Sequence, residues 1–208
     1  YQNKEDILNS PRRLGSTQTK LGDIGYTDVN GDGKIDGEDQ VRIGKPTMPH
    51  FTYAFDFSLG YEGFTLSGLL YGTGERYMTF GNRYQSGEGK YLYYENQLNY
   101  WRPDNTGADF PRISISSGVN GNNNKAGSTF WMRNASYLRL KDLQLSYDFK
   151  YKYLKKCDWL QTCRVNLSGS NLFTISGVSK FFDPETSSTS GDGYPVQRVY
   201  SIGVTIGF

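Results

Sequence analysis

The sequence predicts an all-β protein whose strands belong to a transmembrane antiparallel β-barrel. Two observations carry this prediction: strands that alternate apolar and polar residues, and connections between them that are short and long in turn. The composition agrees, because 17 tyrosines and 12 phenylalanines among 208 residues favour strands. No run of eighteen apolar residues occurs, which excludes a membrane-spanning helix.

The charges are spread evenly along the chain. The 23 basic and 21 acidic residues give a net charge of +2, and no stripe of basic residues is present to neutralise phosphates. We therefore expect no nucleic-acid partner.

The strand signal is clearest in the last nine residues, 200–208. Large apolar residues alternate there with serine, threonine and glycine, so that one face of the strand is apolar and the other is small or polar. This length suits a tilted strand that crosses a bilayer. The earlier strands must then share the same sidedness and close into one barrel, because an open sheet edge cannot lie in lipid.

Four earlier segments show the same alternation. Residues 51–59 and 64–72 are separated by a short turn and predict a hairpin. In residues 137–149 the alternation changes phase near Lys141 and Asp142, which predicts a β-bulge. Residues 164–175 form the fourth segment, after a short connection in which we expect one helical turn.

The long connections are residues 73–135 and 176–195, and residues 1–50 precede the first strand. Tight turns at one end of the strands and long loops at the other are typical of outer-membrane barrels, whose long loops face outward. We therefore divide the chain into an extracellular loop, residues 1–50, and about five barrel strands with long extracellular loops, residues 51–208. A barrel needs about eight strands, so we expect the chain to be a fragment.

Several short motifs resemble those of one family. In chain order they are Gly22–Asp36, Tyr100–Pro103, Ala108–Arg112, Ser136–Asp142, Ser168–Thr174, Phe182–Glu185 and Gly193–Pro195. Together they resemble the C-terminal part of the SusC/RagA family of TonB-dependent outer-membrane transporters.

The resemblance implies a place, partners and an activity. Members of this family resemble 22-stranded barrels of the bacterial outer membrane, which work with a SusD-like lipoprotein lid and take up oligosaccharides or peptides without being enzymes. Their plug and TonB-contacting segment would precede this chain.

Residues 28–39 match the spacing of an EF-hand calcium loop, with Gly33 at the turn position. Five carboxylates within twelve residues repel one another unless a cation lies among them. We expect calcium, with magnesium as the alternative; a metal-free polar turn is the other interpretation. The expected ligands are Asp28, Asn30, Asp32, Lys34 through its carbonyl, Asp36 and Asp39.

The loop 73–135 is rich in aromatic residues. Aromatic faces suit the apolar faces of sugar rings, and tyrosine hydroxyls can bond their edges. The alternative is that these rings pack the loop internally or against the lid. The candidate substrate-binding residues are Tyr84, Tyr91, Tyr93, Tyr94, Tyr100 and Trp101.

Two further alternatives stay open from the sequence. The chain could be a calcium-dependent adhesion or scaffold module built on a water-soluble β-sandwich. Cys157 and Cys163 could form a local disulfide or remain free thiols.

Overall fold

A computed structural model describes residues 1–16, 18–81, 84–85, 94–113, 123–186, 189, 193–194 and 196–208. The chain forms two compact units. The first, here called the loop unit, comprises Tyr1–Lys45, Met78–Arg133 and Ser187–Gly193. The second, the sheet unit, comprises Pro46–Tyr77, Asn134–Thr186 and Tyr194–Phe208.

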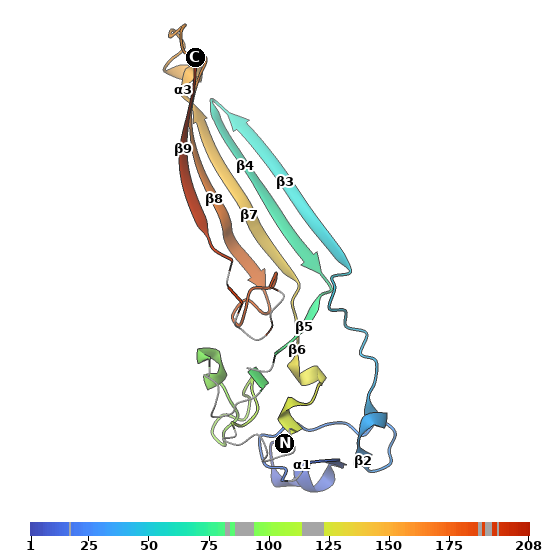
Figure 1. Ribbon diagram of the computed structural model, residues 1–208. Coiled ribbons are helices and arrows are strands. Elements are labelled where there is room, and N and C mark those ends of the chain that lie inside the picture. Colours follow the sequence, from blue (N-terminus) through green and yellow to red (C-terminus); the bar gives the residue numbers. More distant parts are fainter. Residues whose placement is uncertain are drawn as a thin grey trace. The chain divides into compact units, whose positions relative to one another are not determined.

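The sheet unit is built on five antiparallel strands in the order β3-β4-β7-β8-β9 (Figure 1). Their bounds are β3 Phe51–Tyr61, β4 Phe64–Gly74, β7 Tyr137–Asp148, β8 Thr162–Ser176 and β9 Val199–Gly207. Each strand pairs with the next one in this order, so the sheet is a meander. All five predicted strands are therefore confirmed.

The register aligns the apolar residues of all five strands on one face of the sheet. One row across the sheet consists of Leu59, Leu66, Leu145, Leu167 and Ile202. The adjacent row, on the other face, consists of Ser58, Ser67, Gln144, Ser168 and Ser201. The described residues leave much of the apolar face uncovered, since the exposed fractions are 62% for Phe55 and 74% for Ile202.

Aromatic rings of β3 lie across glycines of β4. A Cβ atom at Gly72 would collide with the Tyr53 ring, and one at Gly74 would collide with the Phe51 ring. The Tyr53 hydroxyl continues past β4 and donates to the Tyr137 carbonyl of β7 at 3.2 Å. A larger residue at Gly72 would displace this ring, so the glycine helps to fix the register of three strands.

The predicted β-bulge is present in β7. The pairing register shifts between Leu140 and Asp142 on the β8 side, and Lys141 pairs with neither neighbouring strand. The extra residue restores the apolar alternation at Leu143, and it brings the amino group of Lys141 to a carboxylate that Arg139 also contacts.

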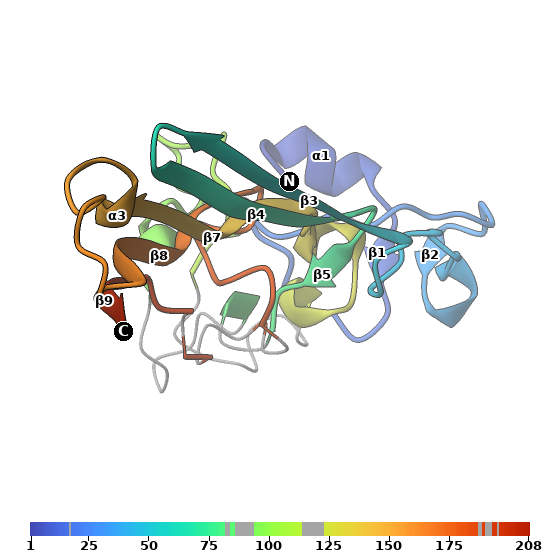
Figure 2. The same ribbon diagram turned by 90° about the horizontal axis from the view of Figure 1, so that it is seen from above.

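The connection between β7 and β8 begins with the short helix α3, Phe149–Lys152, which confirms the expected helical turn. The Asp148 side chain caps it by accepting from the Lys150 amide at 2.9 Å. Figures 1 and 2 show α3 beside the C-terminus at one end of the sheet. In the same connection Trp159 stacks on Phe208, with 5.6 Å between the ring centres.

The loop unit contains short elements around a small core of its own. They are α1 Lys4–Asn9, β1 Arg12–Arg13, β2 Lys34–Ile35, and the 3-10 helices η1 Gly37–Asp39, η2 Glu95–Leu98, η3 Asn123–Lys125 and η4 Thr129–Trp131. Two more strands, β5 Tyr77–Thr79 and β6 Met132–Asn134, pair where the chain passes between the units. No helix among the residues described above is long and apolar enough to cross a membrane.

A buried ion pair stabilises the loop unit. The Asp23 side chain is fully buried and pairs with Arg112, with 2.6 Å between Oδ1 and Nε. The Asn124 amide donates to the same carboxylate at 2.9 Å. Residues that the sequence divides between two loops, 1–50 and 73–135, are thus joined by a satisfied buried charge.

Candidate functional site

The loop of residues 28–39 is organised by hydrogen bonds from backbone amides to carboxylates. Asp28 accepts from the amides of Gly31 and Gly33 at 2.7 and 2.8 Å. Asp39, at the other end, accepts from the amides of Val29 and Asp36 at 2.7 and 2.8 Å. These amide bonds lower the pKa of Asp39, the bond from Asp36 most and that from Val29 next.

The remaining predicted ligands follow the same pattern. Asn30, Asp32 and Asp36 each accept from the amide two residues further along, at 2.9–3.0 Å. Lys34 lies in β2, next to Ile35, which is buried. Each carboxylate oxygen has two lone pairs, so a carboxylate that accepts from an amide still has lone pairs for a cation.

The acidic side chains of this loop do not form a cluster of three that could hold a metal ion. In the part of the chain that the structure describes, no three histidine, cysteine, aspartate or glutamate side chains are placed to hold a metal ion. The loop therefore has the turns of the predicted site, whereas metal binding there stays a prediction. Cys157 and Cys163 are not bonded to each other.

The predicted aromatic residues have different environments. Tyr84 is 3% exposed and stacks on Tyr94, with 4.9 Å between ring centres. Phe80 and Phe110 are also aromatic neighbours of Tyr84. For Tyr84 this geometry favours the packing alternative, because its ring faces are covered by other rings.

Three other candidates, Tyr94, Tyr100 and Trp101, are partly exposed. The Tyr100 ring lies 5.2 Å from the guanidinium of Arg102. The Trp101 indole N–H donates to the Gln2 side chain at 2.7 Å. Tyr94 is half-buried. Tyr91 and Tyr93 lie outside the described residues.

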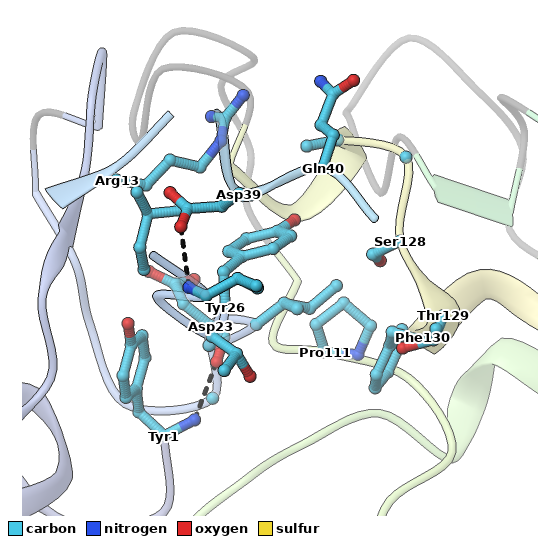
Figure 3. Close-up of a pocket in the computed structure, with 18 of the residues that line it drawn as sticks. Tyr1, Arg13, Asp23, Tyr26, Asp39, Gln40, Pro111, Ser128, Thr129 and Phe130 are labelled. Carbon is cyan, nitrogen blue, oxygen red and sulfur yellow. Dashed lines mark hydrogen bonds between the residues drawn. The ribbon is translucent and has the colours of Figure 1, made fainter. Parts of the chain in front are cut away.

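A groove of about 1400 Å³ runs through the loop unit (Figure 3). Lining residues from 1–14 and 22–43 form one part of it, and lining residues from 101–111 and 126–133 form the other. Tyr26 lines it and donates its hydroxyl to the Asn123 carbonyl at 2.5 Å. Asp39 also lines it, so the end of the predicted metal loop borders this groove (Figure 3).

A second candidate site lies on the polar face of the sheet unit, where the loop after β8 folds back onto β7. Arg139 is 1% exposed and binds two acidic residues of that loop. Its Nη2 lies 2.6 Å from Oδ2 of Asp183, and its Nη1 lies 2.9 Å from Oε2 of Glu185. Its Nε donates to the Thr174 hydroxyl of β8 at 2.8 Å. Three elements are thus held by one guanidinium.

Glu185 also accepts hydrogen bonds from Lys141 and Tyr137. Lys141 lies 2.8 Å from Oε1, and the Tyr137 hydroxyl donates to the same oxygen at 2.6 Å. Desolvation by burial alone would raise the pKa of Glu185, but the hydrogen bonds from Lys141 and Tyr137 and the charge of Arg139 lower it overall. The glutamate is therefore held as a carboxylate.

A cavity of about 580 Å³ opens beside this cluster. Its lining comes from the starts of β3 and β7, the end of β4, and the loop after β8. The lining residues are Pro49, Thr52, Leu69, Tyr71, Thr73, Arg76, Tyr137, Lys141 and Glu185.

The sequence patterns indicated the polar face but not this cluster. Alternation places Arg139 on the polar face, yet it says nothing of a loop more than forty residues later that returns to meet it. One signal could have predicted this cluster. Arg139 is a charged residue in a strand that is mostly apolar or neutral, and a buried arginine requires carboxylate partners.

Known proteins resemble the chain over nearly its whole length. No protein-family model matches the sequence. Two TonB-dependent receptors of Formosa agariphila, P3 and P26, are each 27% identical to it, over 196 and 226 aligned residues. These alignments cover 88% and 100% of this chain. The chain is homologous to the C-terminal part of TonB-dependent receptors.

The solved structures agree with this conclusion. The RagAB peptide importer in its open-open state superposes with a TM-score of 0.64 at 25% identity, covering 93% of this chain and 20% of the importer chain. The closed-closed state gives 0.65 at 26% identity, covering 88% and 20%. The sheet unit is therefore a set of adjacent strands of a TonB-dependent barrel of the bacterial outer membrane, as predicted.

The chain spans only about a fifth of the length of these relatives. The shares are 19% of receptor P3 and 21% of receptor P26. None of these relatives is named as an enzyme. The sandwich alternative is not supported, because the relatives are TonB-dependent receptors and a peptide importer.

Proposed function

We propose that this chain is part of a TonB-dependent importer that takes oligosaccharides or peptides across the outer membrane with a SusD-like surface lipoprotein. The observation that carries the proposal is the two-faced sheet. Its apolar rows suit lipid, and the rows of serine, glutamine and threonine on the other face suit a water-filled interior. The relatives support it, since they are named as receptors and as a peptide importer.

In this proposal the polar face lines part of the route of the solute. Arg139 anchors the loop after β8 at one end of that face. Energy would reach the barrel through TonB contacts in another part of the protein.

We also propose that the loop of residues 28–39 binds one calcium ion, or magnesium in its place. The amide bonds to Asp28 and Asp39 support this, because they already bend the chain into the turns that such a loop needs. The ion would neutralise the carboxylates and fix the outer loop beside the lipoprotein. Nothing in its surroundings suggests a catalytic role.

The partly exposed aromatic candidates remain proposed contacts for a sugar ring or for an apolar side chain of a peptide. This role suits Tyr100 and Trp101 better than Tyr84, because other residues cover the Tyr84 ring. Tyr94 is expected to support the Tyr84 ring rather than to contact solute.

Uptake in cells tests the import proposal. The full-length gene is deleted, and the accumulation of labelled oligosaccharide pools and labelled peptide pools is compared with that of the parent strain and of the complemented strain. We expect loss of uptake of at least one pool on deletion, its return on complementation, and a similar loss when TonB is removed. Equal uptake of every pool in all strains would contradict the proposal.

A further inference from the structure

The cavity on the polar face has an uncompensated positive charge. The cationic groups of Arg139 and Lys141 are matched by the carboxylates of Asp183 and Glu185. Arg76 also lines the cavity, but no carboxylate of the described residues lies within ion-pair distance of it. Its guanidinium donates to the carbonyls of Thr47 and Pro184 instead.

Arg76 therefore keeps donors for a further partner. A guanidinium has five N–H groups, and the two carbonyl bonds use only two of them. Those carbonyl bonds also hold the side chain in place, so a ligand that uses the remaining donors does not have to order it first.

Thr73 provides a second, independent observation. It lines the same cavity, it is only 5% exposed, and its hydroxyl oxygen has no hydrogen-bond partner among the described residues. A buried hydroxyl without a partner costs free energy, and such groups call for an explanation of their own. A ligand oxygen in the cavity would accept this hydrogen bond and remove the cost.

The rest of the lining restricts the ligand. Pro49, Leu69 and the ring of Tyr71 offer an apolar wall. Glu185 contributes a negative charge at the edge of the cavity, which disfavours a doubly charged anion. A planar, singly charged carboxylate next to an apolar group fits both features, and it matches the fork of an arginine.

We propose that this cavity binds a free carboxylate of the imported solute, with Arg76 and Thr73 as the hydrogen-bond donors. The inference rests on the proposed import function and adds the class of solute. Two solutes carry such a group: a peptide with a free C-terminus, and an oligosaccharide that contains a uronic acid.

Binding to the purified full-length protein tests the inference. Calorimetry compares the dipeptide leucyl-leucine with its C-terminal amide, and glucuronic acid with glucose. We expect the free acid of at least one pair to bind at least tenfold more tightly than its uncharged partner. The pair that shows the difference identifies the source of the carboxylate. Equal binding within both pairs, or no binding of any of the four, would overturn the inference.

Substitutions connect the binding to these two residues. Thr73→Val and Arg76→Gln should each lower the affinity for the favoured acid by about tenfold or more. Matched controls on the same face, at the other end of the strands, are Thr65→Val and Arg164→Gln, which should leave the affinity unchanged. Unchanged affinity in both Thr73→Val and Arg76→Gln would also overturn the inference.

A stability measurement separates lost contacts from lost folding. Because the Thr73 hydroxyl has no hydrogen-bond partner among the described residues, Thr73→Val should keep or raise the unfolding temperature of the ligand-free protein. The same substitution should lower the affinity for the acid. If the affinity is unaffected although deletion of the gene abolishes uptake, the carboxylate site is wrong and the import function stands. If deletion leaves uptake intact, the import function itself is wrong.

Discussion

Arg139 of β7 and Glu185 of the loop after β8 form an ion pair across 46 residues of sequence, with 2.9 Å between Nη1 and Oε2. The arginine is 1% exposed, and it also binds Asp183. Taking one partner from a buried pair leaves the other charge without compensation, so this contact fixes the position of the loop.

Replacing Glu185 by glutamine should loosen that loop. The variant keeps the shape of the side chain but removes the charge that Arg139 and Lys141 share, at a cost of about 1–3 kcal/mol. Hydrogen exchange of residues 178–186 in the full-length protein measures the effect. Glu75→Gln is the matched control, because Glu75 is exposed and pairs only with His50 in the described structure. Equal exchange in both variants would contradict the assigned role of Glu185.

Acid should have the same effect as that substitution. The pKa of Glu185 is lowered from its ordinary value of 4.5, so its charge favours the docked loop at every pH above that value. The contribution is lost as the pH falls below 4.5 and through the lowered pKa. Protection of residues 178–186 should therefore be constant between pH 7 and pH 5 and fall below pH 4.5, after correction for intrinsic exchange. A loss already between pH 7 and pH 5 would indicate another titrating group.

The two faces of the sheet should tolerate charge differently. Arginine at Phe55 or Val204 should meet hydrocarbon and cost about 2–4 kcal/mol near the midplane, whereas arginine at Ser58 or Thr205 should be tolerated. Urea unfolding in lipid bilayers measures the cost for the full-length protein. Equal costs on the two faces would contradict the assignment of the apolar face to lipid.

The sheet could be predicted from the sequence because the alternation that defines each strand lies within one short stretch of sequence. Alternation fixes which residues share a face, and the phase change at Lys141 marks the bulge that the register shows. The turn pattern of residues 28–39 was also accessible, since most of it depends on side chains that bond amides two to five residues away. The bond from the Val29 amide to Asp39 spans ten residues and is an exception.

The core of the loop unit could not be predicted in the same way. Phe80, Phe110 and Trp131 carry no periodic signal, yet Phe80 and Trp131 are 1% and 0% exposed and pack together with Phe110. Their burial depends on long-range contacts, such as that between Asp23 and Arg112, which no local pattern encodes. For the same reason the sequence left open whether Tyr84 packs inside the loop or contacts solute.

Removal of calcium should loosen the loop of residues 28–39. Asp28→Ala combined with Asp32→Ala should abolish calcium binding at this loop and increase hydrogen exchange across residues 22–45, while barrel stability stays almost unchanged. A chelator should have the same effect on the unchanged protein and none on the double variant. Exchange that is indifferent to calcium and magnesium would mean that the loop is only a polar turn.

The central claim is that the polar rows of the sheet face a water-filled route for solute, and single cysteines test it most directly. After Cys157 and Cys163 are replaced by serine, cysteines are placed one at a time at Ser67, Gln144 and Ser201, and at their apolar neighbours Leu66, Leu145 and Ile202. In cells, a membrane-impermeant maleimide should react with the three polar-row cysteines, and an imported solute should slow that reaction. The three apolar-row cysteines should stay unmodified. Equal labelling of the two rows, or labelling of the apolar row alone, would contradict the account.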